Sequence, residues 1–205
     1  IYPNADVYLE PDFSLEVTDF TATGNTGNFE QLDVVDNSTD IIISDTLTPV
    51  TITLSDISGL EGESHSITAT VDHEVTGSDL VIQLSNGQSI TIPVGATSGI
   101  SAPFEIQTDD VYVDGETYSV SINSTTGGNF EQLVTTDTST VTVADTPDPV
   151  YAQITVDQAS VLEGGELTYT VNLVDANGNP VTVAAGKSVT VELDWSGIAA
   201  NADDL

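Results

Sequence analysis

Apolar and polar residues alternate along most of this chain. The alternation is clear in residues 51–55 and 66–71, and it continues through the middle of the sequence. A period of two places every second side chain on the same face of a β-strand, and no segment has a convincing 3.6-residue period of a helix. Further positions predicted to share an apolar face are Leu80, Ile82, Leu84, Ile90, Ile92, Phe104, Ile106, Tyr118, Val120, Ile122, Val141 and Val143. The pattern therefore predicts an all-β fold.

One turn between these strands has a recognisable sequence. Asn86-Gly87 stands between the apolar runs at 80–84 and 90–92. Asn-Gly between two alternating runs is typical of a two-residue type I′ hairpin turn. Other turn signals follow roughly every 8–12 residues, as in a seven-strand sandwich. We therefore expect tandem immunoglobulin-like antiparallel β-sandwiches.

An internal repeat of about 100 residues divides the chain. Residues 27–32 and 128–133 both read Gly-Asn-Phe-Glu-Gln-Leu, an offset of 128 − 27 = 101. Three shorter motifs recur in the same order: Asp6-Val7-Tyr8 as Asp110-Val111-Tyr112, Asp45-Thr46 as Asp145-Thr146, and Leu60-Glu61-Gly62 as Leu162-Glu163-Gly164. Ordered repeats at a fixed spacing indicate tandem modules. The repeat predicts the C-terminal half of one module at 1–48, a complete module at 49–148, and the N-terminal half of a third at 149–205.

The net charge of the chain limits the kinds of ligand and partner that it can bind. There are 33 Asp and Glu residues against one Lys or Arg, Lys187, which gives a formal net charge of −32. Such a chain lacks the basic residues that bind nucleic acid or anionic membranes. An acidic chain of this kind is either disordered or neutralised by cations, and the 39% hydrophobic content with strand patterning argues against disorder. Calcium fits a sequence that is rich in oxygen ligands, poor in His and free of Cys.

Three acidic segments are predicted to meet at one end of the complete module. Strands of a sandwich run alternately up and down, so the turn at 60–63, the loop at 108–116 and the exit at 145–149 fall at the same pole. The proposed calcium ligands there are Glu61, Asp109, Asp110, Asp145 and Asp148, with Glu63 and Asp114 as second choices. Crowded carboxylates repel one another unless a cation lies between them. The alternative is a set of solvated polar turns, in which Asp and Gly are common.

The repeat carries this prediction to the other junctions. Asp6, Glu10 and Asp45 would serve the first junction, and Glu163 occupies in the third module the position of Glu61. The first junction has Thr48 and Ala5 where the second has Asp148 and Asp109, so it should bind fewer ions or bind them more weakly.

One further acidic turn lies in the third module. Residues 175–179 read Asp-Ala-Asn-Gly-Asn, which resembles the start of an EF-hand loop but lacks its glycine position and closing Glu. A tight turn is the favoured interpretation. The second is that Asp175 or Asn177 helps to bind a calcium ion from the preceding module.

The motifs together resemble a known family. Leu-Glu-Gly-[Glu/Gly], Ser-Asn-Gly-Gln-Ser-Ile-Thr-Ile-Pro, Asp-Asp-Val-Tyr-Val-Asp-Gly, Gly-Gly-Asn-Phe-Glu and Asp-Thr-Pro are similar to the immunoglobulin-like extender repeats of giant bacterial RTX adhesins, and the segment from Glu192 to Asp204 resembles a Calx-β domain. The resemblance implies calcium at inter-domain linkers, type I secretion, folding outside the cell and a location on the bacterial surface.

We therefore expect a non-catalytic spacer whose partners are neighbouring modules of the same chain, with copies in a filament as a second kind of partner. Insertion into a membrane is not expected. The alternatives are a carbohydrate- or protein-binding module and the accessory domains of a secreted enzyme. Low aromatic content (6%) and short repeated loops favour the spacer. Asp109-Asp110 as paired catalytic carboxylates is disfavoured because no cleft-forming insertion accompanies them.

Overall fold

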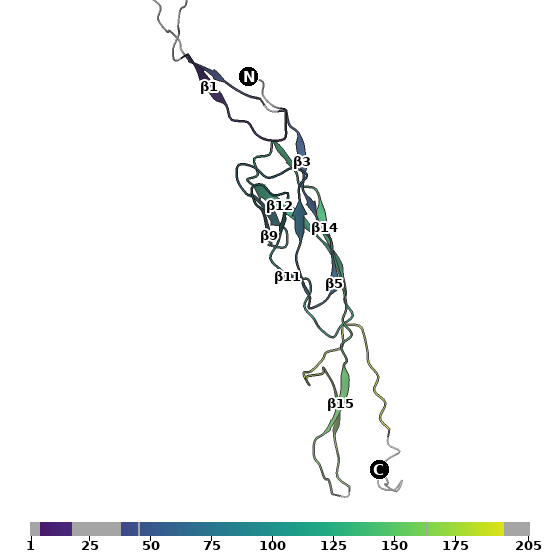
Figure 1. The fold of residues 1–205 in the computed structure, drawn as a ribbon. Helices are drawn as coiled ribbons and strands as arrows, with labels where there is room; N and C mark the ends of the chain where they lie inside the picture. The colour runs from purple at the N-terminus through teal and green to yellow at the C-terminus, as the bar shows by residue number, and fades with distance from the viewer. Residues whose placement is uncertain (1–4, 18–37, 45, 163, 195–205) are drawn as a thin grey trace, which may run out of the picture. The chain divides into compact units, whose positions relative to one another are not determined.

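The computed structural model describes residues 5–17, 38–44, 46–162 and 164–194 (Figure 1). Throughout these ranges the regular elements are strands, and no helix occurs, which confirms the all-β prediction. The chain divides into two compact units. The first comprises Ile1–Ser58, Ser64–Phe104 and Thr117–Thr142, and the second comprises Gly59–Glu63, Glu105–Glu116 and Val143–Leu205. The predicted division into three modules stays a prediction.

The largest sheet has five strands in the order β5-β14-β12-β8-β9. These are β5 (Ile57–Leu60), β14 (Thr138–Ala144), β12 (Thr117–Thr126), β8 (Leu80–Leu84) and β9 (Ser89–Ile92). A second set of short strands comprises β10 (Ser98–Ile100), β7 (Thr68–Thr70) and β4 (Thr53–Leu54) in one sheet, with β11 (Phe104–Glu105) beside β6 (Ser64–His65). Two such sets of strands are consistent with a β-sandwich.

The alternating pattern places the core as expected. Leu80, Ile82 and Leu84 of β8 are buried, whereas Val81 and Gln83 between them are not. The other fully buried apolar side chains of the first unit are Val50, Ile52, Ile67, Ala69, Val75, Ile90, Ile92, Val120 and Val141. The period of two is therefore the pleat of strands that face one apolar core.

The first strand of the sandwich changes sheets. Residues 51–55 read as one strand in the sequence, but the structure has β3 (Pro49–Thr51) and β4 separated at Ile52. β3 runs parallel to β13 (Gln132–Val134), whereas β4 runs antiparallel to β7. One pair thus departs from the expected antiparallel arrangement. Pro49 has no N–H, which suits the first residue of such an edge strand.

The turn at Asn86-Gly87 differs from the prediction. Gly87 has φ of 82° and donates its N–H to the Leu84 carbonyl (3.1 Å), and Leu84 donates to the Gln88 carbonyl (2.9 Å). Among the described residues other than glycine only Asn129 has positive φ, so Asn86 does not adopt the conformation that type I′ requires. The type I′ prediction is wrong. The loop has three residues, 85–87, with glycine in the left-handed position, and the Asn86 side chain accepts the Gln88 N–H (3.1 Å).

Two smaller strand pairs complete the described fold. β1 (Phe13–Glu16) pairs antiparallel with β2 (Ser38–Ile41) in the first unit, and β15 (Tyr151–Val156) pairs antiparallel with β16 (Tyr169–Val174) in the second. β15 is solvent-exposed along its whole length.

Packing at the centre of β8 should dominate the stability of the sandwich. Ile82→Ala should reduce the free energy of unfolding by about 2–5 kcal/mol, because it leaves a cavity at a side chain with 0% exposure. Ile100→Ala is the matched control, since that side chain is 63% exposed. Denaturant titration of both variants is the measurement, and equal losses would contradict this account of the core.

Candidate metal centre

Three segments that are distant in sequence meet in the second unit through backbone hydrogen bonds. Glu61 N–H donates to the Ala144 carbonyl (3.1 Å), and Gly62 N–H donates to the Gln107 carbonyl (2.8 Å). Gly62 has φ of +77°, and a Cβ on it would lie 3.0 Å from the Asp109 Cβ. A glycine is required there because the turn is left-handed and the two segments approach closely. This approach brings the carboxylates of residues 61 and 109 together.

Glu61 is the buried centre of the site, with only 3% of its surface exposed. Its Oε1 accepts hydrogen bonds from the N–H (2.8 Å) and the hydroxyl (3.1 Å) of Thr146. Its Oε2 is buried and has no hydrogen-bond partner. A buried carboxylate oxygen without a donor is costly, since it loses water and gains nothing in return. A cation at Oε2 would remove that cost.

The Thr146 hydroxyl is shared among three carboxylates. Its Oγ1 lies 2.6 Å from Asp109 Oδ1, 3.1 Å from Glu61 Oε1 and 3.3 Å from Asp148 Oδ2. A hydroxyl carries a single hydrogen, so it can donate to only one of the three at a time. The remaining carboxylate oxygens need a positive partner, and the whole chain contains one Lys or Arg.

Two acidic groups in the described part of the chain have the spacing of a cation site. Glu61, Asp109 and Asp148 form one, and Glu61, Asp110 and Asp114 form the other; in each group the oxygens lie within 4.8 Å of one another. Calcium binds oxygens at about 2.3–2.6 Å, so two oxygens on opposite sides of one ion are about 4.6–5.2 Å apart. Because Glu61 belongs to both groups, its two oxygens could bridge a pair of ions.

Asp145 and Glu63 lie outside both groups and have structural partners. Asp145 Oδ1 accepts the N–H groups of Asp114 and Gly115, each at 2.7 Å, so it holds the loop that presents Asp114. Glu63 Oε2 accepts the Leu60 N–H (2.8 Å) within its own turn. The structure therefore gives these two predicted ligands positioning contacts and brings the other five candidates of this junction together.

The pKa of Asp114 is raised in this acidic environment. Loss of solvation, followed by the charges of Asp110, Glu61 and Asp145, raises its pKa above the ordinary value of 3.8, and a hydrogen bond from Gln107 opposes the shift. That bond runs from Gln107 Nε2 to Asp114 Oδ1 (2.9 Å). The Gln107 Oε1 atom is buried without a partner, so this amide oxygen is a further neutral candidate ligand.

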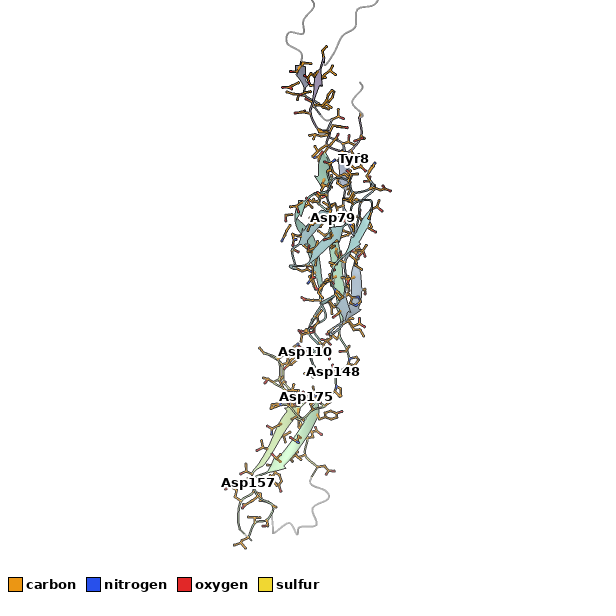
Figure 2. All side chains as sticks on the ribbon, turned by 60° about the vertical axis from the view of Figure 1, so that its left-hand side comes forward. Tyr8, Asp79, Asp110, Asp148, Asp157 and Asp175 are labelled. Carbon is orange, nitrogen blue, oxygen red and sulfur yellow. The ribbon has the colours of Figure 1, made fainter. Side chains whose placement is uncertain are left out.

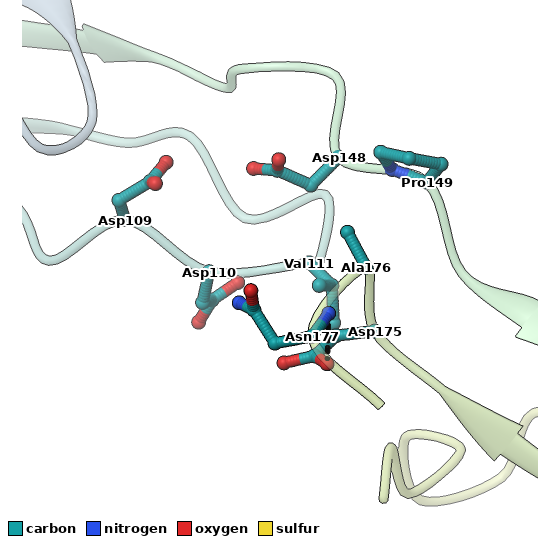
Figure 3. Close-up of a pocket in the computed structure, with 8 residues that line it drawn as sticks. All are labelled: Asp109, Asp110, Val111, Asp148, Pro149, Asp175, Ala176 and Asn177. Atoms are coloured by element: carbon teal, nitrogen blue, oxygen red, sulfur yellow. Dashed lines mark hydrogen bonds between the residues drawn. The ribbon is translucent and has the colours of Figure 1, made fainter. Parts of the chain in front are cut away.

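A pocket beside these groups includes residues 175–177 of the acidic turn. It is lined by Asp109, Asp110, Val111, Asp148, Pro149, Asp175, Ala176 and Asn177 (Figure 3). Asp110, Asp148 and Asp175 also lie close together in the wider view of Figure 2. Asp175 accepts the N–H groups of Asn177 and Asn179 (both 2.8 Å), which is the predicted tight turn. The second interpretation also keeps support, because the turn faces the same pocket.

The candidates of the other junctions are placed differently. Asp6 Oδ1 accepts the Tyr8 N–H (2.8 Å), and neither Asp6 nor Glu10 belongs to an acidic group within the part of the chain that the structure describes. Asp45 and Glu163 lie outside the described residues.

Sequence reasoning missed two residues of the site, Thr146 and Gln107. Thr146 has a sequence signal, since Asp145-Thr146 recurs at 45–46. Gln107 has no comparable signal.

Comparison with known proteins gives one match. Residues 48–146 match the family model of the LapA domain, a domain of a large adhesin-related protein. The match favours an adhesin-related role and association with a cell surface. No curated protein and no solved structure matches the chain. A search of the described residues for a helix of sufficient length and apolarity to cross a membrane finds none.

Removing the charge of Glu61 should have opposite effects with and without calcium. In chelator, Glu61→Gln should raise the melting temperature, because the amide keeps an acceptor for Thr146 and relieves repulsion. In calcium the same variant should lose much of the rise in melting temperature that calcium causes in the parent chain. Thermal unfolding in both buffers is the measurement, and Glu63→Gln in the same turn should leave the calcium dependence intact. A calcium response that is unaltered in Glu61→Gln would contradict the site.

The raised pKa of Asp114 predicts a pH dependence in chelator. A raised carboxyl pKa means that the folded chain favours the protonated form of Asp114. The stability gained from protonation is therefore fully present below pH 3.8 and is lost as the pH rises through the pKa of the folded state. The melting temperature should therefore fall between about pH 4 and neutral, and Asp114→Asn should reduce the fall.

Asp175 shows the opposite shift, because hydrogen bonds from Asn179 lower its pKa. Asp175→Asn should destabilise the chain at neutral pH and less so in acid.

Proposed function

We propose that the chain is a structural spacer region of a secreted bacterial adhesin or surface filament, stiffened by calcium at the junctions between modules. The observation that carries the proposal is the buried Glu61 carboxylate, whose Oε2 has no partner although Asp109, Asp110, Asp114 and Asp148 lie around it. Five carboxylates in such proximity are unfavourable without cations and become a multidentate oxygen site with them.

Calcium at this site would add a further link between segments that are distant in sequence and already share backbone hydrogen bonds. The ligands come from the turn at 59–63, the loop at 105–116 and the exit through Asp148, from which the chain continues into β15. Pro147 and Pro149 flank Asp148 and restrict the backbone there. Ions bound across these segments would reduce the conformations open to the exit. Extracellular calcium modules bind with dissociation constants of about 10⁻⁴–10⁻³ M, so calcium outside the cell suffices to occupy them.

The adhesin part of the proposal is supported by the family match. The matched range, 48–146, lies close to the predicted complete module at 49–148. Together with the resemblance to extender repeats, the match supports a location on the bacterial surface. We propose neighbouring modules of the same chain as the partners, and a role without catalysis.

Calcium should stabilise the chain and extend it. At a free calcium concentration tenfold above the dissociation constant, one site adds about 1.4 kcal/mol to the free energy of unfolding, which corresponds to a rise of several degrees in melting temperature. Thermal unfolding and small-angle scattering of the 1–205 chain, in calcium and in chelator, are the measurements. We expect a higher melting temperature and a longer, less variable particle in calcium.

Magnesium at the same concentration is the control. It prefers six ligands at about 2.1 Å and keeps its water, so it should give a smaller effect. If neither melting temperature nor scattering responds to calcium, the carboxylates serve solubility and the spacer proposal loses its mechanism.

A further inference from the structure

The segment around Tyr8 is bound to the sandwich by a short antiparallel bridge. Leu9 N–H donates to the Asn129 carbonyl (3.1 Å), and Glu131 N–H donates to the Val7 carbonyl (2.9 Å). Tyr8 lies opposite Phe130 in this bridge, and their rings stack with centroids 5.5 Å apart and an interplanar angle of 25°. The side chain of Val7 is buried, with 6% exposed.

The Tyr8 hydroxyl forms a second attachment. It donates to the Glu74 carbonyl (2.7 Å), in the connection between β7 and β8. At the start of the segment Asp6 Oδ1 accepts the Tyr8 N–H (2.8 Å), which orients the tyrosine.

The receiving loop has a strained backbone that serves the contact. Asn129 has φ of 53°, and within the described ranges no other residue apart from glycines has positive φ. In that conformation its carbonyl accepts from Leu9, and its Nδ2 lies 3.4 Å from the Leu9 carbonyl. Asn tolerates the left-handed region better than most residues. Glu131 Oε2 also accepts the N–H of Thr48, just before β3 (2.7 Å).

The tyrosine contacts of this attachment recur one repeat later. Tyr112 N–H donates to Asp110 Oδ1 (2.7 Å), as Tyr8 does to Asp6, and the Tyr112 hydroxyl donates to the Thr182 carbonyl (2.7 Å). Thr182 follows β16 in the chain, as Glu74 follows β7.

We propose that the two recurring motifs, Asp-Val-Tyr and Gly-Asn-Phe-Glu, are the two halves of a clasp that joins each module to the next copy without a metal ion. The Asp-Val-Tyr motif belongs to one module, and its tyrosine hydroxyl donates to a backbone carbonyl of the following module. The Gly-Asn-Phe-Glu loop of that module receives the segment by main-chain bonds and ring stacking. The inference rests on the module division of the proposed function but not on calcium.

The chemistry explains why these residue types recur together. The Asp sets the tyrosine conformation, the Tyr reaches a carbonyl that every sequence offers, and the Asn supplies the left-handed turn. None of these contacts needs a cation, and none involves the unpaired oxygen of Glu61. A junction of this kind would stay in register when calcium is low, and calcium would stiffen it.

Hydrogen exchange of the full 1–205 chain in chelator tests the clasp. The amides of Leu9 and Glu131 should be protected, because both donate within the bridge. Tyr8→Phe keeps the ring and removes the hydroxyl, and it should speed exchange of these amides about fivefold, the effect of losing one neutral hydrogen bond. Tyr151→Phe, on exposed β15, is the matched control and should leave both amides unchanged.

Asn129→Gly provides a second variant that keeps the backbone conformation. Glycine accepts φ of 53° without strain, so the variant removes the Nδ2 contacts to the Leu9 carbonyl (3.4 Å) and the Thr76 hydroxyl (3.5 Å), and exchange at Leu9 should again increase. Unprotected amides at Leu9 and Glu131 in the parent chain would overturn the clasp, as would unchanged exchange in Tyr8→Phe. If the Leu9 and Glu131 amides were protected in calcium but not in chelator, the clasp would depend on a metal ion, contrary to the proposal. Failure of the calcium proposal alone would leave protection in both buffers.

Discussion

The uncompensated carboxylate of Glu61 is the constraint on which this structure depends. A buried negative charge is tolerated only when it is paired, and the chain has almost no basic residues with which to pair it. Thr146 satisfies one of its oxygens and faces Asp109 and Asp148 with the same hydroxyl. The acidic groups have the spacing to hold a metal ion, and we propose that a divalent cation from the medium stabilises them.

Two kinds of acidic residue can be distinguished by their partners within the described ranges. Asp56, Asp79 and Asp137 each accept a backbone N–H, from Thr140 (2.7 Å), Val94 (2.9 Å) and Leu54 (2.8 Å) respectively. They replace the missing Lys and Arg with main-chain donors and hold the ends of strands. The group around Glu61 has too few such donors for its oxygens. The same composition therefore yields carboxylates bonded to the backbone in one place and acidic groups with the spacing to hold a metal ion in another.

The two proposed means of joining modules are physically complementary. The clasp around Tyr8 uses main-chain hydrogen bonds and a stacked ring, which depend little on ions in solution. The acidic groups use long-range charge, which is repulsive without calcium and attractive with it. Asp110 takes part in both, because it orients Tyr112 and belongs to one acidic group. A filament built this way would keep its order of modules in any medium and change its stiffness with calcium.

The sequence by itself determined the strand pattern, the apolar core of β8 and β9, the recurrence of the motifs and most residues of the acidic site. Those features are encoded in short-range periods and in repeats, which can be read without knowing the fold. Only the tertiary structure decided which carboxylates lack donors, because Glu61 and Thr146 are 85 residues apart and their pairing depends on how the strands converge. It likewise assigned Asp145 and Glu63 to backbone contacts and converted the expected turn at Asn86 into a three-residue loop. Asp145 and Glu63 each have a backbone N–H within hydrogen-bond distance and Glu61 Oε2 has none, and only positions in space decide this difference.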